Sequence, residues 1–109
     1  MRNGLYKAHF GNGDVDNLAI VAVRDGHITG CDVTHFITGT YEREGNRFRG
    51  MLVLTRHSQR PDLTEIAYLD RIESPFEGTG GDSFGTFEAE VVQKKGLKIH
   101  VSFQWICGV

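Results

Sequence analysis

The sequence is poor in proline, in cysteine and in long apolar stretches. Of its 109 residues, two are proline and two are cysteine. No apolar run is long enough to cross a bilayer as a helix, so we expect no membrane association. Cys31 and Cys107 can form one disulfide at most. We expect two free thiols and a cytoplasmic location, while a disulfide that joins two strands remains the alternative.

Clusters of basic residues are also missing. The formal net charge is −2, and no stretch of lysine and arginine exceeds two residues. Proteins that bind duplexes usually carry a basic stripe that displaces counterions from several phosphates. We therefore expect no direct binding of nucleic acid, although Arg43, Arg47 and Arg49 can still gather on one strand.

The amino acids that are well supplied favour strands. Phenylalanine, tyrosine, threonine, valine and isoleucine are frequent, and 14 glycines are scattered between apolar runs. A chain of this length removes about two-thirds of its unfolded surface from water on folding, enough for one core. We predict one domain over residues 1–109, with no linker and no internal repeat.

Strict alternation marks the C-terminal segment. Five apolar side chains of residues 97–105 are separated by single polar ones: Leu97, Ile99, Val101, Phe103 and Trp105. This period of two predicts a strand with one buried and one wet face. Residues 84–91 also alternate, and Gly96 in the intervening "QKKG" tolerates positive φ. Residues 84–105 therefore read as a β-hairpin.

The N-terminal half contains a second strong hairpin signal. Residues 5–10 alternate, residues 18–24 are apolar on both faces, and Asp25-Gly26 follows. An Asp-Gly pair between apolar strands favours a type I′ turn, so residues 18–24 and 27–31 should pair antiparallel. Gly30, inside the returning strand, predicts a bulge or a sharp bend.

The remaining segments complete an all-β fold. Two strands are predicted at residues 35–43 and 47–57, joined by "EGN". Residues 63–74 are predicted to form a further strand, or a short helix near 62–73. Residues 74–83 are predicted to form a long loop or a short bent strand. Seven or eight antiparallel strands with tight turns form a barrel or a sandwich. We predict a small up-and-down, lipocalin- or calycin-like barrel of about eight strands, filled or holding one small ligand.

No pattern of reactive side chains predicts catalysis. His27, Cys31 and His35 are spaced by four, which on a strand places each about 13 Å from the next, too far for one metal ion. Asp32 and His35 lack any motif that places a nucleophile beside them, so Asp32 is expected to stabilise a turn through its side chain. Glu88 and Glu90 are expected on the solvent face. We predict no enzyme, no cofactor and no metal.

Several segments together resemble a known family. "NGLY" near the start, "VAVRDGHITGCD", "FITGTYE" and the strand after a charged turn are similar to the GrlR-like family of type III secretion negative regulators. The shared core is Ile28-Thr29-Gly30-Asp32 and Phe36-Gly39-Tyr41. The resemblance implies a dimeric lipocalin-like barrel with an apolar cavity. It also implies a surface loop that contacts a transcriptional activator, although residues 42–47 here are not a run of acids.

Three sets of residues are candidates for binding. A regulatory protein partner is expected at the charged hairpin tip: Glu42, Arg43, Glu44 and Arg47. The two-sided apolar strand is expected to form a homodimer: Leu18, Ile20, Val21 and Val23. If the barrel instead carries or senses a small apolar ligand, the inward candidates are Tyr6, Phe10, Val101, Phe103 and Trp105, and the alternative is that these rings only fill the core.

Overall fold

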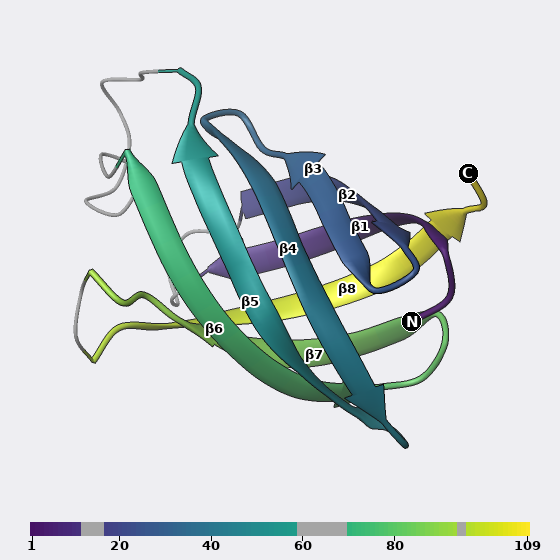
Figure 1. The fold of residues 1–109 in the computed structure, drawn as a ribbon. Helices are drawn as coiled ribbons and strands as arrows, with labels where there is room; N and C mark the ends of the chain where they lie inside the picture. Colours follow the sequence, from purple (N-terminus) through teal and green to yellow (C-terminus); the bar gives the residue numbers. More distant parts are fainter. Residues whose placement is uncertain (12–16, 59–69, 94–95) are drawn as a thin grey trace.

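The chain folds into eight strands that run up and down in sequence order. A computed structural model describes residues 1–11, 17–58, 70–93 and 96–109. The strands are β1 (Gly4–Gly11), β2 (Asn17–Arg24), β3 (His27–Cys31), β4 (His35–Glu44), β5 (Arg47–Arg56), β6 (Arg71–Gly80), β7 (Phe84–Glu90) and β8 (Lys98–Cys107). Figure 1 shows them wrapped around a common axis.

The sheet closes on itself. Each strand pairs antiparallel with the next, and β8 returns to pair with β1, so the barrel has no free edge. The described residues include no helix. The predicted all-β up-and-down barrel of about eight strands is confirmed, and the sandwich alternative is wrong. Closure leaves the strands without unpaired backbone edges.

The predicted tight turns are present. Asp25 and Gly26, between β2 and β3, have φ of 50° and 83°, the positive values that a type I′ turn requires. Gly96, before β8, has φ of 87°. Because the mirror-image turn matches the twist of the flanking strands, the Asp-Gly signal fixed both the turn and the β2–β3 register.

The prediction for residues 74–83 needs correction. These residues were expected to form a loop or a short strand, whereas β6 extends through Gly80 and pairs along its whole length with β5. Glycine and proline made the segment look irregular, yet Ile72, Ser74 and Phe76 alternate inward and are buried. The expected strand or helix near 62–73 is a strand from Arg71 on, and residues 62–69 lie outside the described residues.

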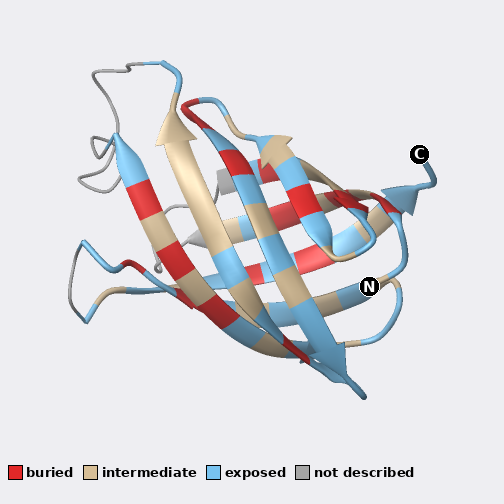
Figure 2. Cartoon of the chain, viewed as in Figure 1, coloured by how far each residue is buried: buried red, intermediate tan, exposed pale blue. Residues whose placement is uncertain are grey.

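Burial alternates along the strands, as Figure 2 shows. One buried cluster forms the core of the barrel: Tyr6, Val23, Ile28, Phe48, Phe76, Ala89 and Phe103. These residues come from every strand except β4, so side chains far apart in sequence meet inside the bore. Removing such area from water supplies roughly 25 cal/mol per Å² of apolar surface.

Inward glycines let neighbouring strands come very close. The β2–β3 register runs through Gly30 without a shift, so the bulge expected there is absent. A Cβ on Gly30 would lie 2.2 Å from the carbonyl oxygen of Ile20, and one on Gly50 would lie 2.0 Å from that of Thr40. Both distances are far below van der Waals contact. These positions therefore require glycine for close backbone approach.

Replacing Gly50 with alanine should destabilise the barrel. The new methyl group would collide with the carbonyl of Thr40 and press on Phe76, and overpacking of this kind costs about 2 kcal/mol. Urea unfolding measures the loss. Gly81→Ala is the matched control, because a Cβ there meets nothing within 4 Å. Equal unfolding midpoints for the two variants would contradict the close-approach explanation.

Candidate functional site

Aromatic rings fill one half of the bore. Phe48 and Phe103 have ring centroids 5.4 Å apart, Tyr6 and Phe103 5.9 Å, and Phe76 and Phe87 4.7 Å. Edge-to-face and tilted contacts at these distances are favourable beyond the area they bury. Met1, at the start of the chain, packs against this cluster together with Tyr41 of β4 and Trp105 of β8. This half is a packed core.

The predicted lining residues are all on inward faces. Tyr6, Val101 and Phe103 are buried, and Phe10 and Trp105 are half-buried. Tyr6 and Phe103 contact other rings, so they fill the core rather than surround an empty space. The prediction missed three rings from β5, β6 and β7: Phe48, Phe76 and Phe87. For Phe48, the sequence carried a usable signal: it lies between Arg47 and Arg49, and in a strand it therefore faces away from these two charged side chains.

The other half of the bore is lined by aliphatic and small side chains. One inward row of residues crosses five adjacent strands. Each member is the direct cross-strand partner of the next: Val21, Gly30, Ile37, Leu54 and Ile72. Ile37 and Ile72 are buried, whereas Val21 and Leu54 are only half-buried although they share the same face. An eight-stranded barrel is filled by side chains or holds one small ligand, and these two inward side chains remain partly accessible.

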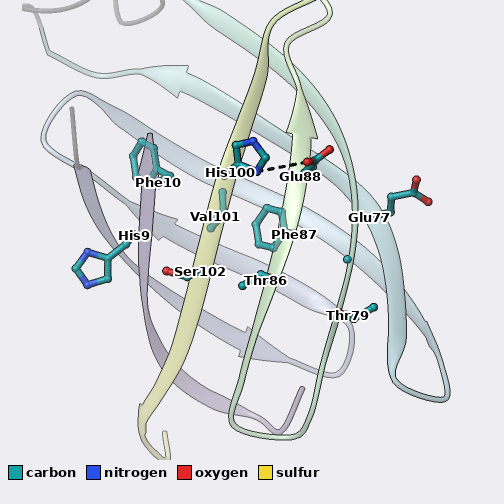
Figure 3. A pocket seen from close by; sticks show the side chains of 11 residues that line it. His9, Phe10, Glu77, Thr79, Thr86, Phe87, Glu88, His100, Val101 and Ser102 are labelled. Carbon is teal, nitrogen blue, oxygen red and sulfur yellow. Dashed lines mark ion pairs between the residues drawn. The ribbon is translucent and has the colours of Figure 1, made fainter. Parts of the chain in front are cut away.

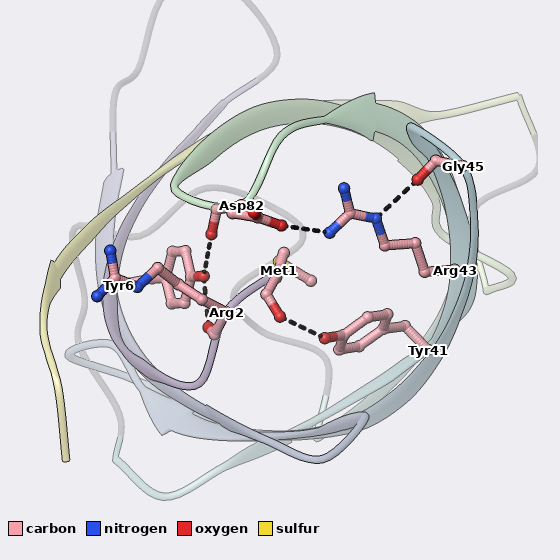
Figure 4. Close-up of polar contacts among 7 residues, drawn as sticks. All are labelled: Met1, Arg2, Tyr6, Tyr41, Arg43, Gly45 and Asp82. Atoms are coloured by element: carbon pink, nitrogen blue, oxygen red, sulfur yellow. Dashed lines mark hydrogen bonds and ion pairs between the residues drawn. The ribbon is translucent and has the colours of Figure 1, made fainter.

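Residues 1–3 close the aromatic end of the barrel, and Figure 4 shows this closure along the axis. The Tyr41 hydroxyl donates to the Met1 carbonyl at 3.2 Å. The Tyr6 hydroxyl lies 2.6 Å from the Arg2 carbonyl and 2.9 Å from that of Asp82 and shares its proton between them. The Trp105 Nε1–H donates to the Asn3 carbonyl at 3.2 Å. We call residues 1–3 the strap.

Arg43, one of the residues of the expected partner-binding tip, also takes part in this closure. Its guanidinium pairs with the Asp82 carboxylate at 2.8 Å and donates through Nε to the Gly45 carbonyl at 2.7 Å. The hydrogen bond and charge of Arg43 hold the pKa of Asp82 below its usual value. Alternation turns Arg43 toward the barrel end, where it remains exposed, as do the other residues of the predicted set, Glu42, Glu44 and Arg47.

Asp32 stabilises the turn between β3 and β4, as its side chain was expected to do. Its Oδ1 accepts hydrogen bonds from the backbone N–H groups of Thr34 at 2.8 Å and of His35 at 2.6 Å. The Thr34 hydroxyl lies 2.8 Å from His35 Nδ1. Thr34 and His35 are each 3 % exposed. The hydroxyl and the imidazole are therefore shielded from any substrate in the solvent.

The spaced set His27, Cys31 and His35 is divided between two faces. His27 and Cys31 are exposed on β3, whereas His35 is buried on β4. Among the described residues, no three His, Cys, Asp or Glu side chains lie close enough to share a metal ion. Cys31 and Cys107 are both free and exposed, which confirms the expected thiols and excludes the disulfide between them.

The outer wall over β6, β7 and β8 is charged and grooved. One open groove of about 650 Å³ is lined from β1 and these strands, and Figure 3 shows His100 turned toward Glu88 there, at 3.4 Å. A second groove of about 720 Å³ extends across to Glu42. Glu77 and Glu88 are direct cross-strand partners, an unfavourable pairing of like charges. Glu88 and Glu90 are exposed, as predicted.

The outer wall over β2 to β5 is largely uncharged. Ile20, Cys31 and Phe36 are direct partners on three adjacent strands, and Ile20 and Phe36 are 43 % and 44 % exposed. Their outward neighbours are also small or apolar: Leu18, Ala22, Thr29, Thr38, Val53 and Thr55. We call this surface the uncharged face. Single exposed apolar residues are ordinary, but a contiguous set usually marks an interaction site.

Two of the four predicted dimer residues lie elsewhere. Leu18 and Ile20 point outward on the uncharged face, but Val23 is 2 % exposed in the core and Val21 packs against the core from inside. The sequence shows apolar side chains on both faces of β2, and alternation sends half of them into the bore. Any contact made by the outside of β2 therefore uses Leu18, Ile20 and Ala22, with Arg24 at the end of the strand.

Comparison with known proteins adds no family assignment. No family model matches the chain, and no curated protein matches it either. The resemblance to the GrlR-like family therefore stays a prediction. Within the described ranges, no helix has the length and apolar character needed to cross a membrane.

Alkaline pH should weaken the fold through Tyr6. Burial, with smaller effects of Tyr41 and Asp82, raises the pKa of Tyr6 from its usual 10.0 to about 12. Between these values the unfolded chain loses the proton while the folded chain keeps it, so the stability present below pH 10 falls as the pH rises toward 12. Urea unfolding at stepped pH and the tyrosinate absorbance band measure both effects.

The control for this prediction is Tyr6→Phe. This variant removes the ionisable group, so its stability should fall less over the same pH range than that of the wild type. A folded wild type in which all three tyrosines ionise near the usual pKa would contradict the burial of this hydroxyl.

Proposed function

We propose that the protein is a non-enzymatic binding module that forms a homodimer and docks a regulatory protein partner. The main support for this proposal is that one side of the outer wall is largely uncharged and the other side is charged. The uncharged face over β2 to β5 presents Leu18, Ile20 and Phe36 to solvent, while the opposite wall over β6 to β8 is charged. A monomer has no need of such an asymmetric surface, because scattered charge is what keeps a surface solvated.

A second copy suits the uncharged face. In a two-fold interface the same patch meets itself, so every charge inside the patch would face a like charge or lose its hydration. The row Ile20–Cys31–Phe36 contains no charged side chain, and the nearest outward cation across the strands is Lys7, opposite Ile20. Depletion of charge at the centre with polar groups at the rim is the usual composition of protein interfaces.

The surroundings of Asp32 and His35 support a role without catalysis. Asp32 Oδ1 is occupied by two backbone N–H groups, and the His35 ring is buried beside Thr34. A nucleophile and its base must both reach a bound substrate. These groups instead stabilise the β3–β4 turn, which positions the first residues of β4 on the uncharged face.

The charged hairpin tip is the proposed contact for a regulatory partner, which the resemblance to the GrlR-like family describes as a transcriptional activator. Glu42, Glu44 and Arg47 are exposed at the end of β4 and the start of β5. Exposed charges at the edge of an interface mainly steer association and select the partner. The tip lies away from the row Ile20–Cys31–Phe36, so one barrel can hold a second copy and a partner together.

A charge on the uncharged face should abolish the dimer. We expect Ile20→Glu to produce a monomer where the wild type is a dimer at micromolar concentration, because the carboxylate would be desolvated in the interface. Light scattering after size exclusion measures the mass. Ser102→Glu, also outward and exposed but on β8, is the matched control and should remain dimeric. A monomeric wild type would overturn the dimer.

A small apolar ligand in the bore is the second candidate function. This second proposal is supported by three inward side chains that are only half-buried: Val21, Leu52 and Leu54. Val21 and Leu52 pack against the aromatic cluster, so a ligand beside them would contact both the rings and aliphatic walls. Pockets for small molecules are typically concave and mostly apolar in this way.

Filling the bore should prevent ligand binding. Leu54→Trp adds bulk to the inward face, whereas Val53→Trp adds the same bulk one residue away on the outer face of β5. Native mass spectrometry of protein purified from its host should show added mass for the wild type and for Val53→Trp but not for Leu54→Trp. The absence of added mass in the wild type would remove this candidate.

A further inference from the structure

The strap is held mainly through its backbone. Its three consecutive carbonyls, those of Met1, Arg2 and Asn3, each accept a hydrogen bond from a ring donor: Tyr41 on β4, Tyr6 on β1 and Trp105 on β8. The Arg2 N–H donates to the carbonyl of Asp82 at 2.9 Å. Recognition of a peptide through main-chain groups does not depend on which chain supplies the backbone.

Side-chain contacts give the same site a preference for sequence. The Arg2 guanidinium lies 3.7 Å from the centre of the Trp105 ring, within the range of a cation–π interaction. The Asn3 amide exchanges two hydrogen bonds with Asp25, at 3.1 and 3.0 Å. Met1 packs against the aromatic cluster. The site is therefore occupied by an apolar, a basic and an asparagine side chain in that order.

The strap is joined to the barrel at a conformational boundary. Gly4 begins β1 with φ of 147°, and a Cβ on it would lie 2.3 Å from Trp105 Nε1. Residues 1–3 precede the strand and lie outside the β-ladder, and Arg2 and Asn3 are exposed. Releasing the strap breaks no strand pairing, so its cost is limited to the contacts named above.

We propose that the strap occupies a peptide-binding site at the aromatic end of the barrel, and that an extended segment of a partner protein with apolar, basic and asparagine side chains can displace it. The strap then acts as an internal competitor. The apparent affinity for the partner equals the intrinsic affinity multiplied by the fraction of time that the strap leaves the site open. This proposal goes beyond the proposed function, because it uses the barrel end and not the uncharged face.

The test weakens the strap and leaves the site intact. In the full-length chain, Arg2→Ala with Asn3→Ala removes the ring stacking and the Asp25 hydrogen bonds but no donor of the site. The probe is the peptide amide Met-Arg-Asn-Gly. The single tryptophan reports binding, since Trp105 contacts both the cation and the carbonyl of the strap.

We expect the double variant to bind the peptide about tenfold more tightly than the wild type, because two side-chain interactions no longer hold the competitor. Arg24→Ala, an exposed residue outside the site, should bind like the wild type. The peptide Met-Glu-Asn-Gly should bind less, since it lacks the cation. Adding Tyr41→Phe to the double variant should weaken binding, because the donor to the first carbonyl is lost.

Two results would overturn the proposal. One is equal affinity of the wild type and the strap-weakened variant for Met-Arg-Asn-Gly, and the other is equal affinity of that variant for the two peptides. Circular dichroism checks that the double variant folds. If it does not, Arg2→Ala alone carries the test with a smaller expected gain.

Discussion

The fold depends on the close approach of strands around a narrow bore. At Gly50 a methyl group would lie 2.0 Å from the Thr40 carbonyl and 3.0 Å from the Phe76 ring, and at Gly85 it would lie 2.6 Å from the Phe103 ring. Phenylalanine rings thus occupy the room that inward glycines leave on the neighbouring strand, as aromatic side chains cover strand glycines in other sheets. The same pairing curves the sheet and fills its interior.

This packing makes the two halves of the bore different. The half with Phe48, Phe76 and Phe103 is solid and is sealed by the strap, whereas the half with Val21 and Leu54 retains partly accessible walls. The rings of Phe76 and Phe103 lie where Gly50 and Gly85 leave room on the neighbouring strand. The small ligand proposed above would then lie in the aliphatic half, and the proposed peptide at the strap end.

Polar groups inside the barrel are satisfied locally. Within the described residues, no buried side-chain nitrogen or oxygen lacks a hydrogen-bond partner. Ser74 donates to the Glu90 carbonyl, and the Tyr6 hydroxyl serves the carbonyls of Arg2 and Asp82. A buried hydroxyl without a partner would cost about 1–3 kcal/mol. The strap therefore satisfies the ring donors at the barrel end, which couples its position to the stability of the core.

Local sequence determined the strands and the tight turns. Alternation over residues 97–105 and the Asp25-Gly26 pair act between neighbours in the chain, so the β8 face and the β2–β3 hairpin could be predicted without coordinates. Tertiary structure decided the rest. It turned Arg43 from the hairpin tip to Asp82, brought the rings of β5, β6 and β7 together, and placed three ring donors on the strap. Side-chain period fixes which face a residue occupies, but only register and closure of the sheet fix which distant residue it meets.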